Sequence, residues 1–252
     1  MAIPKIKQAF KSKLLFTADD FLDGIRLNRY ISKRAIFTYS SIELNKLLIK
    51  ELNLKKIKNL VYGCRAHYIN RKRGLSLLFL SIGAPITAIA TEVMASMGTE
   101  EFLLLGAAGG ISKKLSVGDI VFCTKAIRDE GTFHHYQKDS FYCYPNGDLM
   151  RRLGRSMKRN GIGFMVGPTW TTDAMFRETM AELRHYGRMG IMTVEMETAA
   201  LFSVARARKA KAAALFAISD IPGENEGDSR SYPAKMTDAY KSMVKMAKCF
   251  SE

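Results

Sequence analysis

The chain has 252 residues, of which 47% are hydrophobic and 25% are charged, the balance of a folded globular protein with a sizeable core. That composition excludes a disordered chain, a collagen and a disulfide scaffold. Lys and Arg outnumber Asp and Glu by 39 to 24, so the net charge is +15. Such a charge either forms a solvated surface or attracts phosphate, anionic substrates or nucleic acid.

Strands and helices alternate along the chain. The apolar pattern predicts strands at 35–39, 75–81, 102–105, 118–123, 161–166 and 212–218. It predicts helices at 42–52, 85–97, 173–186, 195–208 and 236–247, the second of them opened by Pro85 and closed by Gly98. This alternation indicates an α/β domain with a largely parallel sheet, in which ligands bind at the carboxyl ends of the strands.

Cysteine usage and the amino terminus bear on the compartment. Cys64, Cys123, Cys143 and Cys249 are widely spaced and form no CxxC pair, so we expect buried free thiols. Residues 1–13 lack the apolar core of a signal peptide, and no stretch is apolar enough for a membrane span. The expected location is the cytoplasm.

Glycines follow the strand predicted at 102–105. In the run from Gly106 to Gly110, backbone N–H groups can approach a ligand closely and form an anion-binding nest, although a tight turn uses the same glycines. The spacing is not GxGxxG, so a dinucleotide site is not expected.

Acidic residues stand at two further places that can carry chemistry. Glu195 and Glu197 begin a predicted helix, where they favour its dipole, and one of them can point into a pocket and clamp the cis-diol of a sugar. Asp220 follows the strand predicted at 212–218, where it either caps a loop or acts as a general acid.

A loop at 129–136 combines two acids with His134 and His135. Their spacing matches no recognised metal motif, so no metal is predicted. We expect this loop, with Thr132 and its aromatic residues, to line a ring-shaped ligand.

Four short segments in this order resemble the nucleoside phosphorylase superfamily, which holds uridine phosphorylases, purine nucleoside phosphorylases and related nucleosidases. They are Ser81-Ile-Gly-Ala-Pro85, Gly106-Ala-Ala-Gly-Gly-Ile111 with Val117-Gly-Asp-Ile120, Val194-Glu-Met-Glu-Thr-Ala-Ala200 and Ile218-Ser-Asp220. The resemblance extends over about residues 34–248. The stretches 128–136 and 172–179 look most like a uridine phosphorylase-like branch.

The resemblance implies a fold and a reaction. The fold is a single α/β domain over 1–252, a central mixed, twisted sheet flanked by helices, with residues 1–33 as an extension that packs at an interface. The reaction is reversible cleavage of a ribosyl–base bond, in which phosphate attacks the anomeric carbon. Inorganic phosphate is then a co-substrate, and no other cofactor is expected.

Roles carry over residue by residue from the resemblance. Asp220 corresponds to the general acid that protonates the leaving base, and Arg65 to an arginine that reaches phosphate across a subunit interface of a dimer or hexamer. The implied substrate contacts are Gly106, Thr132, His135, Glu195, Met196 and Glu197, of which Glu197 binds the ribose hydroxyls.

Departures from the family pattern gather at the phosphate. The family turn Gly-Asp-Pro-x-Arg is here Tyr39-Ser-Ser-Ile-Glu43, a second arginine is Leu104, and a hydroxyl residue is Ala107. Since charge-assisted contacts to an anion are the strong ones, phosphate would depend on Arg65, Ser40, Ser41 and backbone amides. Otherwise water is the nucleophile.

The sequence therefore predicts a nucleoside phosphorylase acting in a homo-oligomer with an interfacial site. The base stays open, because Asp220 indicates a purine and the branch resemblance indicates uridine. A nucleoside hydrolase and an inactive nucleoside-binding protein are the alternatives. Neither a membrane nor a specific nucleic acid is expected as a partner.

Overall fold

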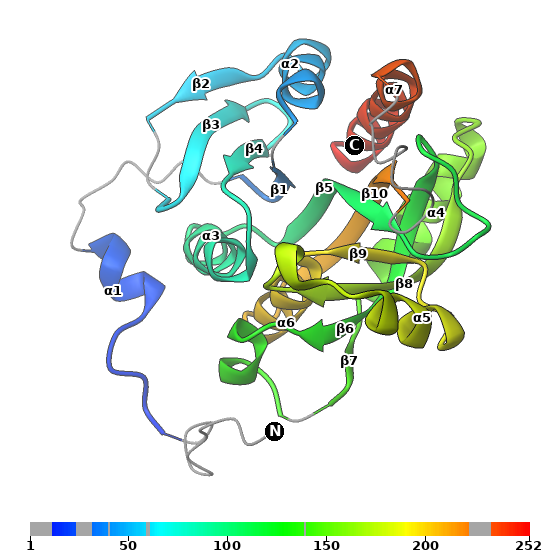
Figure 1. The fold of residues 1–252 in the computed structure, drawn as a ribbon. Coiled ribbons are helices and arrows are strands. Elements are labelled where there is room, and N and C mark those ends of the chain that lie inside the picture. The colour runs from blue at the N-terminus through cyan, green and yellow to red at the C-terminus, as the bar shows by residue number, and fades with distance from the viewer. Residues whose placement is uncertain (1–11, 24–31, 40, 59–60, 139, 222–232) are drawn as a thin grey trace.

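The computed structural model describes residues 12–23, 32–39, 41–58, 61–138, 140–221 and 233–252 (Figure 1). The helices are α1 (Ala18–Asp23), α2 (Ile42–Glu51), α3 (Ala84–Ser96), α4 (Gly147–Arg159), α5 (Met180–Arg188), α6 (Thr198–Ala207) and α7 (Pro233–Phe250). The strands are β1 (Arg34–Thr38), β2 (Lys55–Ile57), β3 (Cys64–Asn70), β4 (Leu75–Leu80), β5 (Glu101–Gly110), β6 (Ile120–Asp129), β7 (Tyr142–Cys143), β8 (Met165–Thr172), β9 (Thr193–Glu195) and β10 (Lys211–Asp220). Two 3-10 turns are η2 (Thr132–His135) and η3 (Met175–Arg177).

The strands form one mixed sheet in the order β10-β6-β8-β9-β5-β1-β4-β3-β2, with β7 on β6. β1 runs parallel to both β4 and β5, whereas β3 and β6 enter antiparallel to β4 and β10. Because β10 also pairs with β5, five of the strands close into a ring. The predicted mixed sheet is thus confirmed, and its closure into a small barrel was not anticipated.

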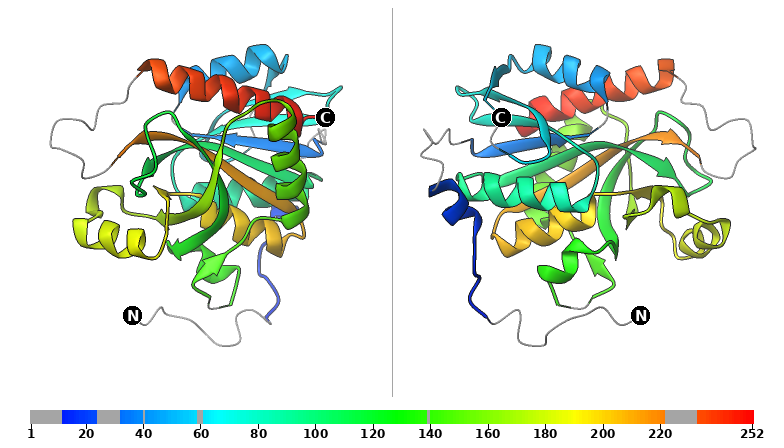
Figure 2. Two further views of the ribbon diagram at one scale, coloured as in Figure 1. Left: turned by 90° about the vertical axis from the view of Figure 1, so that its right-hand side faces the viewer. Right: turned by 60° about the vertical axis from the view of Figure 1, so that its left-hand side comes forward.

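Helices cover both faces of the sheet. On β5, Phe102 and Leu104 pack on the side of α3 and α6, while Leu103 and Leu105 pack on the side of α2, α4 and α7. Successive strand residues point to opposite faces, so a continuous apolar run is what a strand buried on both sides requires. Figure 2 shows α2 and α7 above the sheet and α3 and α6 below it.

Three predicted boundaries are wrong. β5 continues through Gly110, because its glycines keep pairing with β9 and β10 rather than turning. Glu195 ends β9, and helix α6 starts at Thr198. α5 begins at Met180, where Thr179 and Glu182 form a capping box that fixes the helix start.

Two elements were not predicted. α4 is strongly basic and buries little besides Leu149, Leu153 and Met157, although their spacing of four and the N-cap Asn146 mark a helix. The β2–β3 hairpin carries mixed polar residues that give no apolar run. No helix in the described ranges is long and apolar enough to cross a membrane.

The N-terminal segment is described from residue 12. α1 packs beside α3, with the ring of Phe21 5.5 Å from that of Tyr62, and Arg208 lies 3.4 Å from Asp19. Its packing at a subunit interface stays a prediction. All four cysteines are free, as predicted, and Cys249 is half-buried while the other three are buried.

A buried histidine on β3 should make stability depend on acid. His67 is 2% exposed, its Nε2 lies 3.0 Å from the Ser76 hydroxyl, and burial lowers its pKa to about 4. Between pH 6.5 and 4 the unfolded chain binds this proton and the folded chain does not. The free energy of unfolding should therefore fall as pH falls through this window, by about 1.4 kcal/mol per unit from this group.

Urea unfolding of the wild type and of His67→Gln at several pH values measures that contribution. The difference between the two should change across pH 4–6.5 and stay constant above it. The exposed His185 provides the control variant, His185→Gln, which should follow the wild type. A difference that does not change with pH would contradict the assignment.

Candidate functional site

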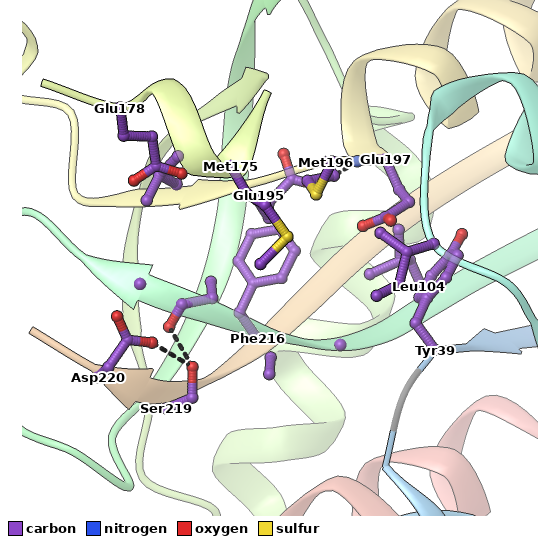
Figure 3. Close-up of a pocket in the computed structure, with 16 residues that line it drawn as sticks. Tyr39, Leu104, Met175, Glu178, Glu195, Met196, Glu197, Phe216, Ser219 and Asp220 are labelled. Atoms are coloured by element: carbon purple, nitrogen blue, oxygen red, sulfur yellow. Dashed lines mark hydrogen bonds between the residues drawn. The ribbon is translucent and has the colours of Figure 1, made fainter. Parts of the chain in front are cut away.

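A cavity of about 260 Å³ opens where the strands of the sheet end at their carboxyl termini (Figure 3). β1, β4, β5, β8, β9 and β10 or the residues directly after them line it, as expected for an α/β fold. Its lining is Tyr39, Ile82, Leu104, Gly106, Ala107, Ala108, Gly109, Met175, Glu178, Val194, Glu195, Met196, Glu197, Phe216, Ser219 and Asp220.

At one end of this pocket lies Glu197, whose side chain is nearly buried. Its Oε1 accepts the Gly83 backbone N–H at 2.7 Å, and Gly83 adopts φ +115° at the start of α3, a conformation that favours glycine. Burial and the charge of Glu195 raise the pKa of Glu197 to about 8. The hydroxyl of Tyr39 lies 2.9 Å from that of Thr87, which in turn donates to the Gly83 carbonyl. This network fixes Gly83 and hence Glu197.

Glu195 has a different task from Glu197. One of its oxygens accepts from the Thr171 hydroxyl at 2.5 Å, and the other accepts the backbone N–H groups of Glu197 and Thr198 and the Thr198 hydroxyl. Its carboxylate thus takes up the free N–H groups at the start of α6. Glu195 reaches the pocket but is saturated by the protein, so it positions Glu197.

Asp220 lies toward the other end of the pocket, at the end of β10 (Figure 3). Its Oδ1 accepts from the Ser219 hydroxyl at 2.6 Å, which leaves its second oxygen facing the cavity without a partner among the described residues. Phe216, fully buried, and Met175 form apolar lining between Asp220 and Glu197.

The middle of the pocket is apolar and its charged groups are all acidic. Gly106 and Met196 lie in the lining, as predicted, and Leu104 and Ala107 lie beside Gly106. Among the described lining residues, four are carboxylates and no Lys, Arg or His is present. A protein of net charge +15 thus keeps its cations away from this site.

Several predicted site residues do not come to the pocket within one chain. Buried Phe133 anchors η2 against α3 and α6, which places His135 in a second cavity and leaves Thr132 outside the lining of the first. Arg65 is exposed on β3, 5.5 Å from the ring of Phe79.

The serines predicted at the phosphate do not line the pocket either. Ser41 caps α2, its hydroxyl accepting the Leu44 N–H at 3.1 Å. Ser40 lies outside the described residues.

Two lining residues were not predicted, Met175 and Glu178. Both lie between β8 and α5, in the stretch 172–179 that carried the branch resemblance, which was the available signal. No group of three or more His, Cys, Asp or Glu within the described chain is arranged to hold a metal ion, so the acidic lining acts as hydrogen-bond acceptors.

Fold and pocket together define an α/β protein that binds a small molecule between buried carboxylates at the carboxyl ends of its strands. The family model described as the phosphorylase superfamily matches residues 35–252, and the chain belongs to that family.

Curated relatives carry three different substrate names. A guanosine phosphorylase of Halorubrum lacusprofundi is 29% identical over 155 residues, 61% of this chain and 64% of that protein. A uridine phosphorylase of Haemophilus influenzae is 29% identical over 140 residues, 50% of this chain and 56% of that protein. A DeoD-type purine nucleoside phosphorylase of Exiguobacterium sibiricum is 27% identical over 162 residues, 64% of this chain and 68% of that protein. The match therefore spans less than two thirds of the first two relatives.

Solved structures share the fold more completely. Purine nucleoside phosphorylase from Toxoplasma gondii, in complex with immucillin-H, superposes with a TM-score of 0.79 at 20% identity, over 90% of this chain and 93% of that one. AMP nucleosidase from Bacteroides thetaiotaomicron gives 0.73 at 20% identity, over 93% and 97%. Because identity is this low, these structures confirm the fold alone.

Proposed function

We propose that this protein is a nucleoside phosphorylase that cleaves a purine nucleoside with inorganic phosphate, releasing the free base and ribose 1-phosphate. The observation that carries the proposal is the pair of carboxylates at the two ends of one pocket, Glu197 and Asp220. Relatives named for guanosine and purine nucleosides support a purine. The uridine phosphorylase-like subtype stays a prediction.

In the proposed reaction each end of the pocket has one task. Glu197 accepts hydrogen bonds from the ribose hydroxyls, and Met196 covers the sugar. A phosphate oxygen attacks C1′ as the bond from C1′ to the base nitrogen breaks, and the electron pair of that bond passes into the base. Asp220, in its protonated form, donates its proton to the base and so stabilises the leaving group.

Phosphate needs a positive charge that the described lining does not hold. We propose that Arg65 of a second copy of the chain supplies it, since Arg65 is exposed and free to meet a neighbour. A homo-oligomer with an interfacial site would then be required for phosphorolysis.

Arg65→Lys should raise the phosphate concentration needed for half-maximal rate by about tenfold or more, because an ammonium cannot copy the forked donors of a guanidinium. Dilution to monomers should have the same effect. Steady-state rates against phosphate concentration measure both. Arg184→Lys, at an exposed arginine on α5, is the control and should leave the phosphate dependence unchanged.

Product analysis tests the reaction itself. Purified protein is incubated with guanosine, inosine, adenosine and uridine, with and without phosphate, and base and sugar products are identified. Free purine base with ribose 1-phosphate, formed only with phosphate, is the expected result. Free ribose at a rate indifferent to phosphate would make the protein a hydrolase, and uridine as the single substrate would overturn the purine assignment.

A further inference from the structure

Glu178 enters the pocket from the segment between η3 and α5, and it faces Asp220. It lines the same cavity, and the structure draws the two carboxylates on either side of the end away from Glu197 (Figure 3). Burial, together with the negative charges of Asp220 and Glu182, raises the pKa of Glu178. The neighbouring capping box of Thr179 and Glu182 fixes the backbone that carries it.

The four carboxylates of the pocket differ in how much of their hydrogen-bonding capacity is used. Glu195 is saturated, Glu197 accepts from Gly83, and Asp220 accepts from Ser219. No described residue donates to Glu178, so both of its oxygens are available. A carboxylate with two free oxygens accepts a pair of adjacent donors in one plane.

Nucleobases differ in whether one edge offers such a pair. Guanine presents N1–H and the 2-amino group side by side, with N7 at the opposite end of the ring system. Hypoxanthine keeps N1–H and lacks the amino group. Adenine places its amino group beside an acceptor nitrogen, and uracil places its N3–H between two carbonyl oxygens, which a carboxylate would repel.

We propose that Glu178 reads the base, accepting N1–H and the 2-amino group of guanine while Asp220 faces N7, so that this pocket selects guanosine. The proposal rests on the proposed function for the orientation of the nucleoside, with its sugar at Glu197 and its base between Glu178 and Asp220. Glu178 is then a specificity-determining residue of the site.

Binding of bases that cannot be cleaved tests the assignment without turnover. Affinities for 9-methylguanine and 9-methylhypoxanthine are measured by calorimetry on wild type, Glu178→Gln and Glu182→Gln. The wild type should bind 9-methylguanine at least about tenfold more tightly. Glu178→Gln should reduce that ratio to about threefold or less, mainly through weaker 9-methylguanine binding.

Glu182→Gln is the matched control. It removes the same charge one helical turn away and keeps a residue that completes a capping box, so the ratio should stay at the wild-type value. Thermal unfolding of each variant checks that the fold is intact.

The outcomes separate this proposal from the reaction. A wild type that binds both bases equally, or a Glu178→Gln variant that keeps the ratio, overturns the reading of guanine by Glu178 even if nucleosides are cleaved. A Glu178-dependent preference in a protein that cleaves no nucleoside supports the base assignment and overturns the proposed reaction.

Discussion

Replacing Asp220 by Asn should slow the cleavage of purine nucleosides by about 10²–10⁴-fold, the usual contribution of a general acid. Asp220 reaches the pocket with one oxygen unoccupied by described residues, and Asn keeps its size while losing the transferable proton. The measurement is kcat/KM for guanosine and inosine at saturating phosphate.

A substrate with a charged base separates acid catalysis from loss of structure. 7-Methylguanosine already carries a positive charge at N7 and leaves without protonation, so Asp220→Asn should slow it far less than guanosine. Asp238→Asn, at an exposed position on α7, should affect neither substrate. Equal slowing of both nucleosides by Asp220→Asn would remove the acid role.

Replacing Glu197 by Gln should lower kcat/KM by about 10–150-fold, the scale of about 1.5–3 kcal/mol for a hydrogen bond to a charged group. The loss should depend on pH, because burial raises the pKa of Glu197 to about 8. Below that pH the side chain is largely neutral and resembles Gln. The loss should therefore be small near pH 6 and reach its full size near pH 9.

Deoxynucleosides provide the check on this prediction. A 2′-deoxynucleoside lacks one of the two hydroxyls, so Glu197→Gln should cost it less than it costs the ribonucleoside. Unchanged kinetics of the variant at pH 9, with the fold intact, would place Glu197 outside the sugar site.

The layered fold could be predicted from sequence because it depends on local apolar patterns. Strands such as β4 and β10 are short apolar runs, and α2 has its leucines on one side. The closure of the sheet could not be predicted, since no local pattern says that β10 also pairs with β5. The basic α4 was missed because its three buried residues stand among many charges.

The site divides in the same way. Asp220, Gly106 and Glu197 could be found because they stand at the ends of recognisable elements. Glu195 looked like a second substrate ligand, since its hydrogen bonds to Thr171 and to the start of α6 depend on tertiary structure. Glu178 lies in an irregular turn, and its approach to Asp220 follows from how β8 and β10 are placed in the barrel.

The position of β10 has a consequence for how the protein is made. β5 and β6 follow each other in the chain but do not pair directly, because β10 lies between them. Until the ten residues of β10 leave the ribosome and insert, both strands present unpaired edges, which are prone to pairing with other chains. That insertion is a long-range step of the slow kind, and it also delivers Asp220. The nascent chain therefore acquires its barrel and its candidate acid in one late event, so truncation before residue 211 abolishes both together.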